Sequence, residues 1–237
     1  NVGFGYGCLN DLEKSIKYYD RAINANPNDP LLLTESDKIY EQANIPTDQR
    51  LKRLESHLKT VMKHDDAVMR LLTLYNAESK YDKSIKILNT RHFHLWEGGG
   101  QVHDIYADSH ILKGMQFLKR KQYKEAIREF DLANQYPSNL EVAPSPNGGY
   151  EAKIYYLSGI AYEAMKQTDK AKICFEKSAD THFRSHLTDL NYYKIKSLRK
   201  LNRNGEADVA LSNMQKTLER ILRNPTDSYA TFGEANQ

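Results

Sequence analysis

The chain has 237 residues, in which 34 Lys and Arg oppose 31 Asp and Glu for a formal net charge of +3. This length is enough to bury a sizeable core, but so small a charge does not indicate a nucleic-acid binder. No apolar run is long enough to cross a membrane, and two cysteines, Cys8 and Cys174, cannot build a disulfide-dense scaffold or a four-cysteine zinc site.

The first residue, Asn1, follows no initiator methionine, and no signal-peptide pattern comes after it. We therefore expect a piece of a longer protein whose true N-terminus is missing. The sequence leaves the compartment undetermined: the cytoplasm is slightly favoured, and the periplasm and the cell exterior stay open.

Two signatures recur along the chain. The first is a small or apolar residue followed three positions later by an aromatic one, and the second is a small residue followed four positions later by an aromatic residue or Leu. The signatures start twelve residues apart in four copies, at Gly3 and Ser15, Leu72 and Ser84, Gly114 and Ala126, and Gly159 and Ala171. A more worn copy runs through Leu198, Leu201, Gly205, Ala210 and Met214.

This spacing predicts pairs of helices that cross closely at the small residues, with the large side chains filling the gaps beside them. Asp29 before Pro30 is a good helix start, and Thr47 is another. We expect an all-α chain of about six helical hairpins, at 1–27, 30–64, 66–90, 103–136, 151–180 and 189–222, followed by a polar tail at 224–237.

The pattern resembles the tetratricopeptide repeat (TPR), a helical hairpin of about 34 residues. The resemblance implies a right-handed superhelix, or α-solenoid, that serves as a non-catalytic interaction scaffold. No enzyme, cofactor or metal ion is expected for this chain, because no nucleophile, phosphate-binding loop or fixed ligand spacing accompanies the repeats.

Two connections between hairpins, 89–102 and 136–150, are longer than such junctions usually are. Because both follow a second helix, they should emerge on the same edge and lie side by side. The first holds a candidate binding set in which aromatic area meets directed hydrogen bonds. The alternative is that Phe93 and Trp96 merely seal the seam between repeats. The loop-edge candidates are Arg91, Phe93, His94, Trp96, Glu97, Asn139 and Tyr150.

These loops also carry a narrower resemblance, to a bacterial family of long proteins in which a β-rich N-terminal region of unknown function precedes a TPR array. The matching positions are Arg91, Phe93, Trp96, Glu97, Gly98, Gly99, Tyr136, Pro137, Asn139, Leu140, Tyr155, Tyr156, Leu157, Gly159, Ala161 and Tyr162. This resemblance implies that the chain is the repeat region of a larger protein, with a carbohydrate-related role as the alternative function of the two loops.

In TPR arrays the first helix of each hairpin lines a groove, at positions three before and one after the small residue. Here these positions are Met69, Thr73, Ile111, Met115, Tyr156, Ile160, Ile195 and Arg199. An apolar set of this kind disfavours a clamp for chaperone carboxylates and suits an extended or helical protein segment, including one from the missing N-terminal region. The alternative is that neighbouring repeats cover these residues.

Two further groups of residues have candidate roles. Tyr155–Tyr156 and Tyr192–Tyr193 are adjacent pairs, and since helix neighbours are about 100° apart, one member of each pair should be available for binding or for a seam. Histidines flank the glycine loop, and a metal-binding cluster there is a minor alternative to no metal site, as is a pair four residues apart. These histidines are His92, His94, His103 and His110, and the pair is His182 and His186.

Overall fold

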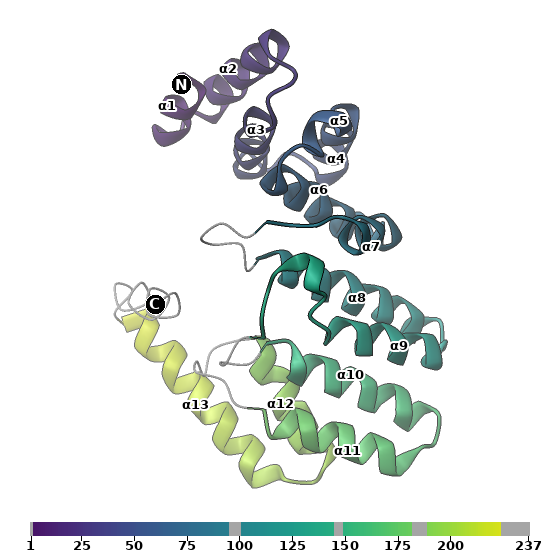
Figure 1. The fold of residues 1–237 in the computed structure, drawn as a ribbon. Helices are drawn as coiled ribbons and strands as arrows, with labels where there is room; N and C mark the ends of the chain where they lie inside the picture. The colour runs from purple at the N-terminus through teal and green to yellow at the C-terminus, as the bar shows by residue number, and fades with distance from the viewer. Residues whose placement is uncertain (1, 95–100, 145–148, 182–188, 224–237) are drawn as a thin grey trace. The chain divides into compact units, whose positions relative to one another are not determined.

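A computed structural model describes residues 2–94, 101–144, 149–181 and 189–223. Within these ranges the chain forms thirteen α-helices and one short 3₁₀ helix, and no strand (Figure 1). The predicted all-α class and its antiparallel helix pairs are confirmed. None of the helices in these ranges is both long enough and apolar enough to span a membrane.

The helices follow one another as hairpins, and within a hairpin a short turn joins the two helices. Their bounds are α1 (Val2–Cys8), α2 (Leu12–Ala25), α3 (Pro30–Gln42), α4 (Thr47–Ser56), α5 (Leu58–Val61), α6 (Asp65–Ala77), α7 (Tyr81–Thr90), α8 (Gln101–Lys119), α9 (Tyr123–Ala133), η1 (Ser138–Leu140), α10 (Glu151–Ala164), α11 (Thr168–Ala179), α12 (Asp189–Lys200) and α13 (Asn204–Arg223).

The chain divides into two compact units. Unit 1 comprises Asn1–Lys113 with Tyr136–Val142, and unit 2 comprises Gly114–Gln135 with Ala143–Gln237. In unit 1 a continuous apolar core runs from Ile23 on α2 through the leucines of α4, α6 and α7 to Leu140 on η1. In unit 2 a smaller cluster joins α11, α12 and α13 around Leu198 and Ala207.

The recurring small residues mark where the two helices of a hairpin touch. A Cβ built on Gly114 would lie 2.5 Å from the Phe130 ring, and one on Gly159 would lie 2.5 Å from the Phe175 ring. Gly3 faces Tyr19 in the same way, at 2.9 Å. Each aromatic residue follows its glycine by sixteen positions, so one spacing rule gives the same helix crossing three times.

The turns inside the hairpins repeat as well. Asn10, Lys121 and Lys166 each lie seven residues after the small position and adopt positive φ, at 57°, 61° and 59°. This left-handed residue ends the first helix and lets the chain reverse. In the last hairpin the same residue is Asn202, with φ of 59°. Ile195 lies seven residues before Asn202, so it occupies the position that the small residue holds in the other hairpins.

The register of the last repeat therefore differs from the predicted one by three residues. Ala207, twelve residues after Ile195, is fully buried, as the small residue of a second helix should be. The prediction had placed Leu198 and Ala210 at these positions. By the same rule, the predicted groove positions of α12 become Tyr192 and Lys196 in place of Ile195 and Arg199.

The second repeat lacks the small-and-aromatic signature and is held by charges. Asp37 on α3 is 1% exposed and accepts hydrogen bonds from Arg50 Nε and Nη2 on α4 at 2.9 and 2.8 Å. Arg70 on α6 donates to the same carboxylate at 2.7 Å. Both arginines also pair with Glu41. One buried carboxylate thus joins three helices.

The two predicted helix starts have different outcomes. Asp29 caps α3 as expected, because its carboxylate accepts a hydrogen bond from the Leu31 backbone N–H at 2.9 Å. Helix α4 does begin at Thr47, but Pro46 is its N-cap residue and no side chain caps it. The Thr47 hydroxyl donates to Glu78 instead.

Candidate functional site

The first parts of the two long connections touch each other in unit 1, as predicted. The Phe93 backbone N–H donates to the Asn139 carbonyl at 2.9 Å. The Asn139 side-chain amide donates to the carbonyls of Leu88 and Arg91, both at 2.7 Å. Three hydrogen bonds therefore join η1 to the end of α7 and to the segment that follows it.

Most loop-edge candidates in this junction have structural partners. Arg91 Nε and Nη2 both donate to Asp65 Oδ1, at 2.8 and 2.6 Å, and Nη1 donates to the Met62 carbonyl at 2.9 Å. Phe93 is 1% exposed and packs in the core of unit 1. The Phe93 side chain therefore packs inside unit 1, which agrees with the alternative that it seals the seam between repeats.

The remaining loop-edge candidates are placed differently. His94 is exposed, and its backbone N–H donates to Asp65 Oδ2 at 2.9 Å. Tyr150 is the half-buried N-cap residue of α10 in unit 2. Trp96 and Glu97 lie outside the described residues, so their part of the prediction stays a prediction.

The four histidines near the first loop do not gather into one cluster. His103 is buried and stacks on Tyr136, with ring centroids 3.8 Å apart, and His110 is buried edge-on to Tyr106. His92 and His94 are exposed, and His92 Nε2 lies 2.7 Å from Glu141 Oε1. His182 and His186 lie outside the described residues.

The predicted groove residues vary in exposure. In unit 1, Ile111 is fully buried, whereas Met69 is half-buried and Thr73 is exposed. In unit 2, Met115 and Ile160 are half-buried and Tyr156 is only 7% exposed. Ile111 and Tyr156 therefore belong mainly to the packing, in line with the alternative that neighbouring helices cover part of the groove. Arg199 is exposed and pairs with Asp208 at 2.7 Å.

A tyrosine face, formed by Tyr156 on α10 with Tyr192, Tyr193 and Lys196 on α12, lies in unit 2. The Lys196 ammonium lies 5.4 Å from the Tyr156 ring centroid and 5.2 Å from that of Tyr192, and it donates to the Tyr192 hydroxyl at 3.2 Å. The hydrogen bond to Tyr192 raises the pKa of Lys196. Tyr192 is 52% exposed. In each tyrosine pair one member is more accessible than the other, as predicted. Tyr192 is the exposed member of its pair, and Tyr155 is half-buried whereas Tyr156 is buried.

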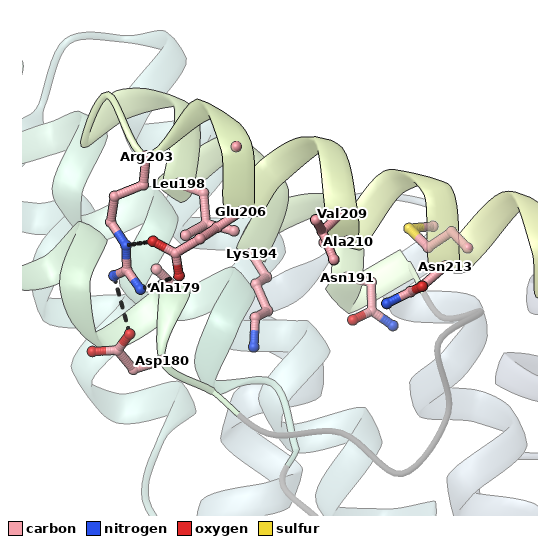
Figure 2. Close-up of a pocket in the computed structure, with 12 residues that line it drawn as sticks. Ala179, Asp180, Asn191, Lys194, Leu198, Arg203, Glu206, Val209, Ala210 and Asn213 are labelled. Carbon is pink, nitrogen blue, oxygen red and sulfur yellow. Dashed lines mark hydrogen bonds and ion pairs between the residues drawn. The ribbon is translucent and has the colours of Figure 1, made fainter.

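Unit 2 also contains a cavity of about 610 Å³ between the end of α11, α12 and α13 (Figure 2). Its charged groups are largely paired, since Arg203 bridges Asp180 and Glu206 at 3.2 and 2.7 Å. Lys194 donates to the Thr181 carbonyl at 2.7 Å, and burial lowers its pKa. The rest of the lining is amide and apolar: Ala179, Asn191, Leu198, Gly205, Val209, Ala210, Asn213 and Met214.

Sequence reasoning missed two features of these surfaces. Lys196 was not among the predicted groove residues, because the signature of the last repeat is weak and its predicted register lies three residues too far along the chain. Glu141 was overlooked because no motif marks it, and only the fold of η1 brings it to His92. The left-handed conformation of Glu141, with φ of 51°, leaves no reliable signal in a non-glycine residue.

Comparison with known proteins agrees with the helical hairpins. The family profile described as tetratricopeptide repeat matches residues 6–29 and 152–180. The crystal structure of the MamA protein aligns with a TM-score of 0.51 at 17% identity, covering 76% of this chain and 87% of that chain. The C-terminal part of a TPR repeat-containing protein from Cytophaga hutchinsonii aligns with a TM-score of 0.50 at 13% identity, covering 91% and 77%. The two matched segments thus resemble the tetratricopeptide repeat, and the chain shares the helical-hairpin fold of these two structures.

Proposed function

We propose that the chain is a non-catalytic scaffold that binds an extended protein segment, and that the tyrosine face of α10 and α12 contacts it. The segment would come from another protein or from elsewhere in the parent chain. The observation that supports this is the Lys196 ammonium, which lies within 5.4 Å of the Tyr156 and Tyr192 ring centroids at predicted groove positions of α10 and α12.

The chemistry of this face defines the segment. Tyr192 offers an exposed ring for an apolar or aromatic side chain, and Lys196 offers a positive charge to a carboxylate. Lys153 lies 5.8 Å from the Tyr193 ring and adds a second positive charge. We therefore expect a segment in which acidic and aromatic residues alternate or adjoin.

The alternative of a carbohydrate site at the two long loops has less support. Arg91 and Asn139 are bonded within unit 1, and Phe93 is buried, so these three have little left for a sugar. Trp96→Ala tests the alternative. Loss of binding on a glycan array with unchanged helicity would favour a carbohydrate role over the one proposed.

The proposal is tested by selecting binders from a random peptide library on the purified chain and measuring their affinity by calorimetry. We expect acidic-aromatic peptides, and Tyr192→Ala with Lys196→Ala should weaken them at least about tenfold, because hot-spot tyrosines and charge pairs dominate such contacts. The matched control is Ile173→Ala with Lys172→Ala, an exposed pair on the second helix α11. The proposal would be contradicted if both double variants lost peptide affinity equally, or if neither double variant changed the affinity of the selected peptides.

A further inference from the structure

Three side chains at the loop junction of unit 1 converge without any role in the proposed function. They are His92 and His94, from the segment after α7, and Glu141, which follows η1. Their ligand-type atoms, one from each residue, all lie within 4.8 Å of one another. All three residues are exposed, so solvent and ions can reach them.

The two histidines point the same way because Phe93 points the other way. Arg91 ends α7 in an extended conformation, with φ of −92° and ψ of 138°. Phe93 is buried and His92 and His94 on either side of it are exposed, which is the alternation of faces that extended chain gives. Their ring centroids are 4.8 Å apart at an interplanar angle of 64°.

Glu141 is carried to the histidines by equally firm neighbours. Leu140 is fully buried, and the Asn139 amide holds the backbone at Leu88 and Arg91. The left-handed conformation of Glu141 then aims its side chain at His92, whose Nε2 lies 2.7 Å from Oε1. The left-handed conformation is unfavourable for a non-glycine residue, so the surrounding structure enforces this turn.

The surroundings also suit a cation. Glu141 supplies a negative charge among the three ligands. Arg91, in the same segment as the two histidines, forms an ion pair with Asp65 at 2.6 Å, which compensates its positive charge. Asp65 Oδ2 accepts a hydrogen bond from the His94 backbone N–H and so fixes the position of that ligand from behind. In metal sites, residues that hydrogen-bond to the ligand residues without touching the metal hold the ligands in place in the same way.

We propose that His92, His94 and Glu141 form a site for Zn²⁺ or a similar divalent transition-metal ion. Two imidazoles and one carboxylate are ligands that zinc prefers, and three protein ligands leave a fourth position for water or a partner group. The sequence favoured no metal site, and its minor alternative grouped His92 and His94 with His103 and His110 and did not include Glu141.

The distances are compatible with such an ion after small side-chain rotations. In a tetrahedral zinc site, bonds of about 2.0–2.1 Å separate ligand atoms by about 3.3 Å. His92 and Glu141 are closer than that, at hydrogen-bond distance, and the widest pair is within 4.8 Å. The ion would replace the hydrogen between His92 and Glu141 and draw His94 inward. Bound there, it would join the segment after α7 to η1.

The test is calorimetric titration of the chelator-treated full chain with zinc chloride, with cobalt(II) absorption as a spectroscopic readout of ligand type. We expect one saturable site per chain, and a higher thermal midpoint with zinc than without. His94→Ala and Glu141→Gln should each lower the affinity at least about tenfold, since even outer-shell changes cost 10–100-fold. Glu141→Gln retains a hydrogen-bond acceptor for His92, so it separates metal binding from the hydrogen bond.

Two controls make the result decisive. His57→Ala removes a half-buried histidine elsewhere in unit 1 and should leave zinc affinity unchanged. The double variant His182→Ala with His186→Ala removes the other histidine pair and should also bind zinc normally. No saturable binding, or binding that persists in His94→Ala but is lost in the double variant, would overturn the proposal. Circular dichroism of each variant establishes that it is folded.

Discussion

The hairpin α10–α11 of unit 2 and the helix group α3, α4 and α6 of unit 1 achieve close packing by opposite means. In α10–α11 the helices meet where Gly159 leaves room for the Phe175 ring. In the unit 1 group the central contact is the Asp37 carboxylate between two arginines. The first contact is set by shape and the second by charge and hydrogen bonding.

This difference determines how each region should respond to mutation. A glycine against a ring is sensitive to a single added methyl group, whereas the removal of a carboxylate leaves buried guanidinium groups without a counter-charge. It also determines which region is visible in the sequence. The glycine and phenylalanine recur at fixed spacing, while the charged residues belong to no repeat.

The largest expected effect is that of Asp37→Ala. Arg50 is 5% exposed and would keep its charge in a buried place with its main partner gone. Breaking a buried pair from one side costs about 3–5 kcal/mol. We expect the free energy of unfolding of unit 1 to fall by that amount in urea denaturation, with faster amide exchange in α3, α4 and α6.

The control for this variant is Asp48→Ala, which removes an exposed carboxylate paired with Lys52 on α4. Exposed pairs contribute little, so no measurable change is expected. If Asp37→Ala were as mild as Asp48→Ala, the charged group would not be what holds α3, α4 and α6 together.

A smaller effect is expected from Gly159→Ala in unit 2. The added Cβ would lie 2.5 Å from a ring atom of Phe175, which is itself buried and cannot move freely. Overpacking of this kind costs about 1–3 kcal/mol, partly offset by the better helix propensity of alanine. Urea denaturation followed by amide exchange in α10 and α11 measures it.

The same substitution at Gly205 should have the opposite sign. A Cβ there would meet nothing within 4 Å, so Gly205→Ala should be neutral or slightly stabilising. Adding Phe175→Leu to Gly159→Ala should cost less than the sum of the two changes, because a smaller side chain relieves the contact. Strict additivity would show that the glycine does not act through that ring.

The fold was largely predictable, because helix crossings leave a periodic trace. Gly3, Gly114 and Gly159 marked three hairpins directly. The last repeat was set three residues late because Ile195 is neither small nor aromatic, and only the left-handed Asn202 reveals the true register. The second repeat was the hardest, since Asp37 and its arginines carry no periodic signal.

The candidate sites were less predictable than the fold. The loop candidates follow from their residue types, but burial determines which of them can contact a ligand. Phe93 points into the core, whereas its neighbours point outward. The approach of Glu141 to His92 joins residues 49 positions apart and depends on one left-handed residue. No local pattern in the sequence encodes such a contact.

A pH-dependent effect of about 1 kcal/mol tests the polar packing of unit 1. Tyr75 on α6 is 4% exposed, and burial, together with the nearby Glu55 carboxylate, raises its pKa from 10.0 to about 12. A raised folded-state pKa means that the contribution to stability is complete below pH 10 and is lost as the pH rises through 12. At pH 11 the folded chain should have lost about 1 kcal/mol relative to pH 8 through this group.

Tyr75→Phe should remove that loss. The difference in unfolding free energy between the variant and the natural chain should be constant from pH 7 to 9 and then shift in favour of the variant up to pH 11. Tyrosinate absorbance should at the same time lose one late-titrating group. A parallel pH dependence of both proteins would mean that Tyr75 ionises like an exposed tyrosine. In that case Lys83, which lies 5.2 Å from its ring and donates to Glu55 at 2.8 Å, would offset the burial more than the packing of α4 and α6 suggests.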